Sequence, residues 1–588
     1  MNFFRKFKFE IIICLIFILL TLVFTFPLVF NLRSQIYDYK GDLLETLWYV
    51  WWAKYAWQYD LSSQFVPIIA VPFGIDLSQD IAKNISLSFA NYPLLMLTVL
   101  TDEIFAYNFI MLLTFPLAGM AMYLLTYYFT KSRWGSFFAG LAFSFCPYHF
   151  AHASHITLAN IQWMPLFVLF LFKMHNERTY LSATLCGLFF ALTLLSDTYY
   201  GFFMLVLAGT FVIFKLFRRL IHKRANFVPH TGFFKNLSLI VIAVFVAVLI
   251  WFPYIFPILR SYLFENGAGL SLQKYIRDIS QLYIYSTKMF DYILPATNQP
   301  VFGSITQKFV GSIFYGESVQ EHSLYLGLVT IFLAFFGYRF WQDRKKMQVQ
   351  DVAERRRLDF SIKFFASLAI VAFLFSLSPT FMILGRHIKM PSYYVFQVLP
   401  FFRAIARFGI IVILALCVLA GFGFKFLIER LNNPLKKTTV KYSLIFLLVF
   451  EFMNIPPFRT TDIGNVPEVY LWLKDQNEKS IVIEYPLGND VEYIFYQRVH
   501  KKRLVNGALP KTEAYSIAEK IKDITKPGTT DILRKLDVEF VILHLDSDDY
   551  QQSEQLVIMK ELDNFDKKYG LVLIKEFNGT KVFKLRKD

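Results

Sequence analysis

Long apolar runs alternate with short polar or basic segments over the first 458 residues of the chain. A helix needs about 20 predominantly apolar residues to cross a bilayer. Eleven runs approach that length, so the pattern predicts a mainly α, polytopic membrane bundle. They cover residues 10–30, 104–128, 134–150, 157–174, 179–196, 198–216, 236–258, 322–341, 361–385, 404–428 and 440–456.

Two segments of this region resemble spans but need separate treatment. Basic residues precede the run at 10–30, as in a secretory signal, but the run is longer than a signal's apolar part and no small-residue cleavage site follows it. We therefore expect it to be retained as a span. The apolar stretch at 85–100 is short and carries Pro93 in its middle, which favours a re-entrant or interfacial helix that does not cross.

Basic clusters between the runs predict the orientation in the membrane. They lie at residues 215–224, 344–357 and 436–437, and Lys and Arg concentrate in cytoplasmic loops. With the N-terminus in the cytoplasm and 85–100 not crossing, all three clusters fall on the cytoplasmic side. The chain is then a multi-pass protein of the plasma (inner) membrane, and the loops 31–103 and 259–321 are extracytoplasmic.

The composition changes from residue 459 onward, which divides the chain into a membrane domain at 1–458 and an extracytoplasmic domain at 459–588. The second part is charged and has ordinary hydrophobic periodicity. It is therefore expected to be a small α/β domain. Helices are predicted from Pro467, over 530–536 and over 551–569, strands over 480–485 and 538–543, and a hairpin through the Asn578-Gly579 turn.

Composition excludes several classes of protein. The chain is 56% hydrophobic and 18% charged, with a mean hydropathy of +0.44. So little polar surface cannot cover a soluble enzyme, and disordered and fibrous proteins are excluded as well. The net charge of +16 is accounted for by cytoplasmic loops, so we expect no nucleic-acid partner. The four cysteines lie in apolar runs and are expected to be core residues.

Two carboxylates follow the first span. Asp42 and Glu45 open a segment whose aromatic residues recur at helical spacing, which is typical of a helix lying in the membrane interface. Such a helix would hold Asp42 at the membrane surface as a general base. The alternative is that Asp42 only caps the helix. The aromatic residues are Trp48, Trp51, Trp52, Tyr55 and Trp57.

Three histidines recur at intervals of three residues, at His149, His152 and His155. This spacing keeps them on one part of a helix circumference. They are candidates for contact with a phosphate or a sugar, for metal binding, or for a structural role. The spacing alone does not decide among these.

Further charged residues lie at the expected outer ends of the spans. An ionisable residue at such a place indicates a functional role. Asp197, followed by Tyr199, sits in a tight helical hairpin and could also be a helix cap. Arg403 and Arg407 are one turn apart, and their guanidinium forks suit phosphate oxygens, with snorkelling to headgroups as the alternative. Glu321 opens the run at 322–341. Because these groups gather at one face, a proton or ion transporter is disfavoured.

The order of these features resembles the GT-C superfamily of membrane glycosyltransferases, which use polyprenyl-phosphate-linked sugars, and most closely a large, largely uncharacterised prokaryotic group within it. A first span followed by an outer loop with a carboxylate and an aromatic helix is the superfamily's opening pattern. The likeness covers nearly the whole chain. The stretches that carry it are Gly41-Asp42 with Trp48 to Trp52, Val71-Pro72-Phe73-Gly74, Ser144 to Tyr148 with His152, Asn160, Gln162-Trp163 and Pro165-Leu166, Pro400 to Arg403 with Ala406 to Gly409, and Glu484 to Leu487 with Tyr496-Gln497 and Asn506-Gly507.

The resemblance implies that Asp42 is the catalytic base. Many members of the superfamily have two adjacent acids or Asp-x-Asp at this point, whereas this chain has Gly41-Asp42 with Asp38 and Glu45 nearby. The departure leaves Asp38 as a rival for the base. It also means that a divalent metal is not favoured, and no other cofactor is expected.

The resulting hypothesis is a hexosyltransferase-like enzyme that moves a sugar from a polyprenyl-phosphate donor to a glycan, lipid or protein acceptor outside the cytoplasm. A lipid-linked glycan transporter or flippase, and a non-catalytic envelope assembly protein, are the alternatives. Contacts with sugar or phosphate are expected from Glu45, His149, His152, His155, Gln162, Asp197, Tyr199, Glu321, Arg403 and Arg407.

Overall fold

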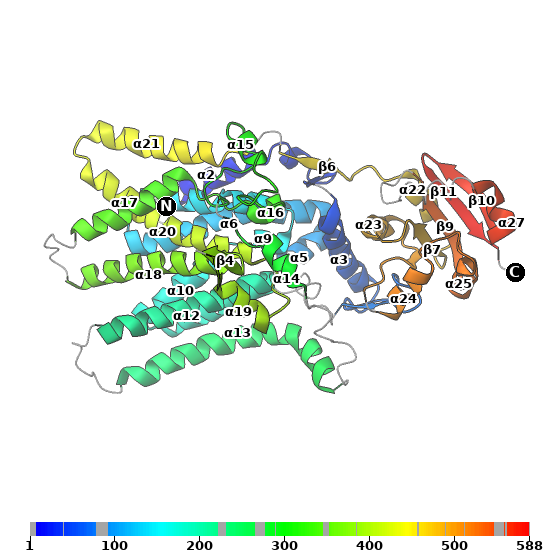
Figure 1. The fold of residues 1–588 in the computed structure, drawn as a ribbon, viewed down its shortest axis with the longest axis horizontal. Coiled ribbons are helices and arrows are strands. Elements are labelled where there is room, and N and C mark those ends of the chain that lie inside the picture. The colour runs from blue at the N-terminus through cyan, green and yellow to red at the C-terminus, as the bar shows by residue number, and fades with distance from the viewer. Residues whose placement is uncertain are drawn as a thin grey trace.

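The computed structural model places a helical bundle at one end of the molecule and a mixed-sheet domain at the other, with helix α3 (Gly41–Gln58) between them (Figure 1). This agrees with the predicted division into a helical membrane part and a C-terminal α/β part. The structure describes residues 7–38, 40–77, 92–221, 231–264, 277–288, 290–344, 352–383, 385–454, 458–488, 490–510, 512–545, 558 and 561–586.

Each of the eleven predicted runs contains a helix. Within the described residues, six segments are long and apolar enough to cross a membrane, among them α6, α12, α13 and α20. An α-helix rises about 1.5 Å per residue, so the 22 residues of α20 span about 33 Å. The helices are α2 (Lys8–Phe24), α6 (Glu103–Thr130), α7 (Arg133–Ser144), α10 (Trp163–Glu177), α11 (Tyr180–Ser196), α12 (Thr198–Ile221), α13 (Thr231–Phe264), α17 (Leu328–Arg344), α18 (Val352–Ser376), α20 (Gly409–Arg430) and α21 (Pro434–Glu451).

Helix α20 lies at the centre of the bundle and α13 at its edge. Of the six candidate spans, α20 is the most buried and α13 the least. Close approach to α20 depends on glycine, because a Cβ on Gly135 of α7 would lie 2.5 Å from the Gly421 carbonyl oxygen, and one on Gly423 would lie 1.9 Å from that of Leu333 in α17. Small residues at helix contacts are typical of membrane bundles.

Two of the predicted spans are interrupted. The run at 134–150 is not one helix, because α7 ends at Ser144 and a new short helix, α8 (Pro147–Ala151), begins at a proline. Proline has no N–H and cannot continue a preceding helix. The run at 157–174 likewise splits into α9 (Ile156–Ala159) and α10. The predicted histidines therefore lie on irregular backbone between α7 and α10.

Short elements cover one end of the bundle. Helix α5 (Tyr92–Leu100) has nine residues and spans only about 14 Å, which fits the predicted non-crossing helix; residues 85–91 of that prediction lie outside the described residues. The others are η1 (Leu28–Phe30), β2 (Phe65–Val66), β3 (Ile75–Asp76), α14 (Ile279–Ile284), α15 (Gly303–Gln307), α16 (Val319–His322), β4 (Thr380–Ile383), β5 (Arg386–Lys389), α19 (Pro391–Val398) and η5 (Ile405–Phe408).

The C-terminal domain is built on a five-stranded mixed sheet in the order β10-β11-β9-β7-β8. Strand β7 pairs in parallel with β8 and β9, whereas β11 is antiparallel to both of its neighbours. The predicted hairpin and the two predicted strands are confirmed. The elements are α22 (Glu468–Lys474), β7 (Ile481–Tyr485), α23 (Val491–His500), β8 (Arg503–Leu504), α24 (Glu513–Lys520), α25 (Thr529–Lys535), β9 (Val538–His544), η6 (Leu562–Asn564), α27 (Phe565–Tyr569), β10 (Leu571–Phe577) and β11 (Thr580–Leu585).

Two connections hold this domain against the bundle. Strand β1 (Gln35–Tyr37) of the first outer loop pairs antiparallel with β6 (Thr460–Asp462), and α23 packs on α3. The Trp48 indole N–H of α3 donates to the Gln497 side-chain oxygen of α23 at 3.1 Å. The start of α3 is therefore held by both parts of the molecule.

Candidate functional site

Asp42 lies in the first turn of α3 and is exposed. The helix begins at Gly41, so the cap position belongs to Lys40, and no side chain caps the helix by a hydrogen bond. Asp42 is thus not the N-cap that the sequence allowed as an alternative. In the described part of the chain, no side chain hydrogen-bonds to its carboxylate. Glu45, one turn further on, accepts a hydrogen bond from the Tyr49 hydroxyl at 3.0 Å.

The aromatic stripe of α3 is mostly buried in protein, contrary to the expectation of a helix lying open in the membrane interface. Trp48 and Trp52 are completely buried, whereas Trp57 at the end of the helix is 71% exposed. The reason is that α23 covers one side of α3, a contact between segments far apart in the sequence.

His149 is a structural residue. Its Nδ1 lies 2.7 Å from the Ser144 carbonyl, and its Nε2 lies 3.0 Å from the Ala159 carbonyl and 3.1 Å from the Thr114 hydroxyl. The imidazole is fully buried and stacks on Phe115. These contacts fasten the irregular segment between α7 and α10 and leave His149 without a free nitrogen for a ligand.

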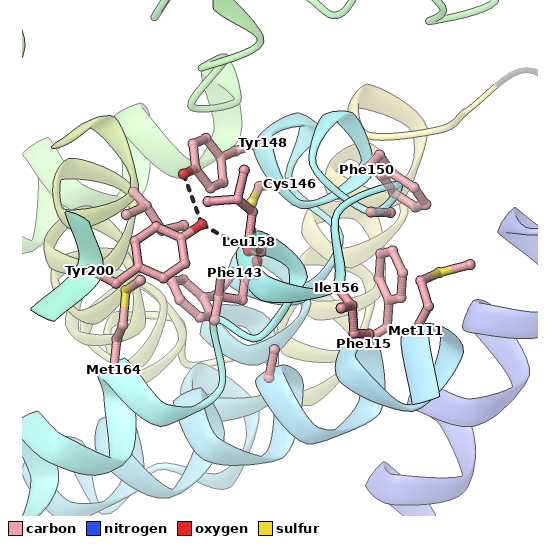
Figure 2. Close-up of a cluster of buried hydrophobic side chains, with 14 of the residues drawn as sticks. Met111, Phe115, Phe143, Cys146, Tyr148, Phe150, Ile156, Leu158, Met164 and Tyr200 are labelled. Atoms are coloured by element: carbon pink, nitrogen blue, oxygen red, sulfur yellow. Dashed lines mark hydrogen bonds between the residues drawn. The ribbon is translucent and has the colours of Figure 1, made fainter. Parts of the chain in front are cut away.

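The His152 side chain faces Glu321. Its Nδ1 contacts the Tyr148 carbonyl at 2.9 Å, and its Nε2 faces Glu321 Oε2 at 3.6 Å with no closer partner. Figure 2 shows how the preceding turn is fixed: the Tyr148 hydroxyl meets the Tyr200 hydroxyl at 2.9 Å, which donates to the Leu158 carbonyl at 2.8 Å. Residues from α8, α9 and α12 thereby hold His152 in place.

Glu321 and Arg407 form a closely bonded ion pair. The Arg407 Nε lies 3.0 Å from both carboxylate oxygens, and the guanidinium also lies over the Tyr199 ring at 5.1 Å. Burial of the Glu321 carboxylate opposes its ionisation, but the charge of Arg407 and the contact with His152 outweigh it and hold the pKa of Glu321 below its usual value.

His155 is affected by the charges of both this pair and Asp42. Burial lowers the pKa of His155, and the negative charge of Asp42 partly opposes the shift, with smaller effects from His152, Arg407 and Glu321. Electrostatic effects of this kind fall off with distance. The charges of Asp42 and of the Glu321–Arg407 pair therefore both act on His155, although these residues are spread over 366 positions of sequence.

Asp197 and Tyr199 lie at the start of α12 beside this network. The Asp197 carboxylate accepts the Tyr199 backbone N–H at 2.8 Å and that of Tyr200 at 3.4 Å, which is the helix-capping role left open by the sequence. The Tyr199 hydroxyl accepts the Arg403 backbone N–H at 3.1 Å and donates to the Phe401 carbonyl at 3.2 Å. Tyr199 thus ties α12 to the loop before α20.

Arg403 borders the same region and is half-buried. Its guanidinium donates to the Gln281 side-chain oxygen at 3.0 Å and lies over the Tyr285 ring at 5.0 Å. Unlike Arg407, it has no carboxylate partner among the ion pairs of the described residues. Gln281 was not foreseen from the sequence, because its segment has no periodicity that would place it against Arg403.

Gln162 lies at the start of α10, deep in the fold. Its amide nitrogen donates to the Asn160 side chain at 3.0 Å, while its buried side-chain oxygen has no hydrogen-bond partner. No described contact connects Gln162 to the Glu321–Arg407 pair. Among the described residues, no cluster of three or more His, Cys, Asp and Glu side chains is arranged to hold a metal ion.

Comparisons with known proteins place this geometry in a fold and a family. Residues 92–449 match a family described as a domain of unknown function, DUF6311. Since the match covers more than half of the sequence, the chain belongs to that family. No curated protein matches the chain.

Solved structures that resemble the chain include an archaeal oligosaccharyltransferase and ArnT. The archaeal oligosaccharyltransferase AglB from Archaeoglobus fulgidus, in complex with an inhibitory peptide and a dolichol-phosphate, superposes with a TM-score of 0.52 at 11% identity, over 99% of this chain and 74% of that one. The oligosaccharyltransferase of the same organism in its apo form gives 0.51 at 11% identity, over 93% and 70%. ArnT from Cupriavidus metallidurans gives 0.41 at 10% identity, over 99% and 98%. The chain therefore has the GT-C fold over nearly its whole length, as its sequence motifs implied.

Proposed function

We propose that this protein is a membrane glycosyltransferase that moves a sugar from a polyprenyl-phosphate-linked donor to a glycan, lipid or protein acceptor outside the cytoplasm. The observation that carries the proposal is the Glu321–Arg407 ion pair that faces His152, together with the charges of Asp42 and of this pair, which all act on His155. An exposed carboxylate without a hydrogen-bonded partner, beside several buried charges, is typical of a catalytic site. The GT-C fold adds support.

Asp42 is the base in this proposal. Its carboxylate takes the proton from an acceptor hydroxyl, whose oxygen forms the new bond to the anomeric carbon of the sugar. The bond from that carbon to the phosphate oxygen breaks, and the lipid phosphate leaves with the bonding electrons. Asp38 is a weaker rival, because it forms an ion pair with Arg459 at 3.3 Å.

Arg403 is the proposed ligand of the leaving phosphate, because its charge is not neutralised by a carboxylate. A fixed cation beside a developing negative charge lowers the barrier for its departure. Arg407 is already held by Glu321, so we assign this pair and His152 the role of fixing α16 against the segment before α20. A polyprenyl-phosphate donor is in keeping with the dolichol-phosphate present in the AglB complex.

The decisive experiment is sugar transfer by the purified full chain in lipid nanodiscs. A panel of polyprenyl-phosphate sugars is supplied, and the release of lipid phosphate and the formation of glycosylated product are followed together. We expect turnover with at least one donor. Asp42→Asn should lower the rate by about 10²–10⁴-fold, the contribution of a positioned general base.

Asp60→Asn is the matched control. Asp60 is an exposed acid just beyond the other end of α3, so this variant should retain wild-type turnover. An Asp42→Asn protein that folds and still transfers sugar would remove Asp42 from its role. Movement of the lipid across the membrane without any glycosyl product would instead support the transporter alternative.

A further inference from the structure

The helical bundle contains a cavity whose lining includes none of the residues assigned to the proposed active site. This partly open cavity of about 580 Å³ is lined by residues of α10, α11, α12 and α13. Its lining follows one face of α12, from Leu205 through Ala208 and Val212 to Lys215 and Arg219. Residues three and four positions apart lie on the same side of a helix. The cavity therefore extends about 21 Å along α12, which is more than one leaflet's share of a hydrocarbon core about 30 Å thick.

The cavity is apolar along most of its length and basic at one end. Lys215, Arg219 and His175 line this end, together with the Asn236 amide, and the Lys215 ammonium lies 3.4 Å from the His175 ring. The charged groups that act on Lys215 are Arg178 and Arg219, both cations. Asp359, an acid of α18 in contact with α12, is already paired with Arg218 at 2.8 Å and Lys363 at 3.3 Å.

This basic end faces the opposite side of the membrane from the proposed active site. Lys215 is 18 residues beyond Asp197 on the same continuous helix, which corresponds to about 27 Å. A ligand anchored at Lys215 cannot present its headgroup to Asp42. The cavity therefore serves a different molecule from the donor phosphate that reacts.

We propose that this cavity binds one anionic glycerophospholipid of the bilayer, with its phosphate at Lys215 and Arg219 and an acyl chain against α12 and α13. Among the described residues no carboxylate forms an ion pair with Lys215 or Arg219. Cations at the membrane surface favour an anionic headgroup, and basic pockets between helices are a known form of lipid recognition. The tail of a polyprenyl donor is a less suitable occupant, because a hydrocarbon chain carries no charge that could pair with the cations. This site does not depend on the proposed sugar transfer.

The test is the binding of phosphatidylglycerol to the delipidated full chain in detergent, measured by native mass spectrometry, with phosphatidylcholine and a polyprenyl phosphate as competitors. We expect one phosphatidylglycerol to bind in preference to both. The double variant Lys215→Ala/Arg219→Ala should bind it about thirtyfold more weakly, since each surface cation contributes about fivefold. Ala208→Trp, which fills the cavity and leaves the charges in place, should also weaken binding.

The control is Lys436→Ala/Lys437→Ala, which removes two cations at the start of α21, outside the cavity. This variant should bind phosphatidylglycerol as the wild type does. Equal binding of phosphatidylglycerol and phosphatidylcholine, unchanged binding by the Lys215→Ala/Arg219→Ala protein, or preferential retention of the polyprenyl phosphate would each overturn the proposal.

Discussion

At the scale of single residues, the most consequential contact is the ion pair between Glu321 and Arg407. Their side chains are only 7% and 17% exposed, so neither charge is well solvated on its own. Removing one member of a buried pair costs far more than the pair itself contributes, because an uncompensated charge is left behind. The pair therefore acts as a fixed joint between α16 and the start of α20.

We expect Glu321→Gln to destabilise the protein by about 3–5 kcal/mol, since the Arg407 guanidinium would stay buried without its counter-charge. Thermal unfolding of the purified full chain in detergent provides the measurement. Asp531→Asn is the control, because Asp531 is 68% exposed and pairs with Arg534 at 2.7 Å, and an exposed pair of this kind contributes about 0–1 kcal/mol. Equal effects of the two substitutions would contradict the role of the Glu321–Arg407 pair as a fixed joint between α16 and the start of α20.

A second prediction at this scale concerns acid sensitivity of the C-terminal domain. His500 is buried in α23, its Nδ1 accepts the Lys502 backbone N–H at 3.0 Å, and its Nε2 has no partner. Burial, with a smaller effect of the Lys502 charge, lowers the pKa of His500 to about 3. The pKa of His500 in the folded protein lies below the unfolded value of about 6.5. Its contribution to the free energy of unfolding is therefore complete above pH 6.5 and is lost as the pH falls toward 3.

Between pH 6.5 and pH 5 the loss from His500 amounts to about 2 kcal/mol, at about 1.4 kcal/mol for each pH unit and proton. The loss arises because His500 takes up a proton when the protein unfolds. The His500→Gln variant lacks this proton uptake, so its thermal unfolding midpoint should fall less steeply over that pH interval than that of the wild type. Parallel pH profiles of the two proteins would show that His500 does not titrate in this way.

The residue-level chemistry could be recognised from the sequence only where a polar side chain interrupts an apolar run. Asp42, Asp197, Arg403 and Arg407 stand out in this way. Their partners do not, because Gln281, for example, lies in the six-residue helix α14, which is too short for a periodic pattern to reveal it. Nor did the spacing of the three histidines reveal that His149 is fully bonded within the fold while His152 faces Glu321.

At the scale of elements, the helices followed from the apolar runs, because a bilayer requires about 20 apolar residues in one continuous helix. The breaks after Ser144 and Ala159 could not be predicted in this way. Mean hydropathy is averaged over a long window, and the turn before Pro147 is too short to lower that average. The packing of α23 on α3 could not be predicted either, because the residues in contact are 449 positions apart.

The contact between α23 and α3 leads to a prediction about Gln497. Its side chain accepts the Trp48 indole N–H and donates to the carbonyls of Ile68 and Lys502 at 2.7 and 2.9 Å, and it is completely buried. Gln497→Ala would leave these groups without partners, at about 1–3 kcal/mol for each buried group. We expect faster amide hydrogen exchange in α3 and α23, by roughly thirtyfold for a loss of 2 kcal/mol.

Gln476→Ala is the matched control for this experiment. Gln476 follows α22, and its amide donates only within its own segment, to the Trp472 carbonyl at 3.2 Å. Exchange in α3 should then stay at the wild-type rate. If Gln497→Ala also leaves α3 unchanged, the C-terminal domain does not hold the helix that carries Asp42.

At the scale of the whole molecule, the proposed active site and the proposed lipid site lie toward opposite ends of the helical bundle. Helix α20 begins beside Arg407 and ends at Arg430, about 33 Å away, so the proposed active site and the basic cavity lie at opposite faces. The positive-inside rule assigns the basic face to the cytoplasm. We therefore predict that the C-terminal domain, which contacts α3, is extracytoplasmic.

This orientation is testable with single cysteines in the full chain. Lys526→Cys places an exposed thiol in the C-terminal domain, and Lys436→Cys places one at the start of α21, on the basic face; the native Cys146, Cys186 and Cys417 are buried. A membrane-impermeant maleimide added to intact cells should label Lys526→Cys, and should label Lys436→Cys only after permeabilisation. The reverse pattern would place Asp42 on the cytoplasmic side, where an acceptor outside the cytoplasm could not reach it.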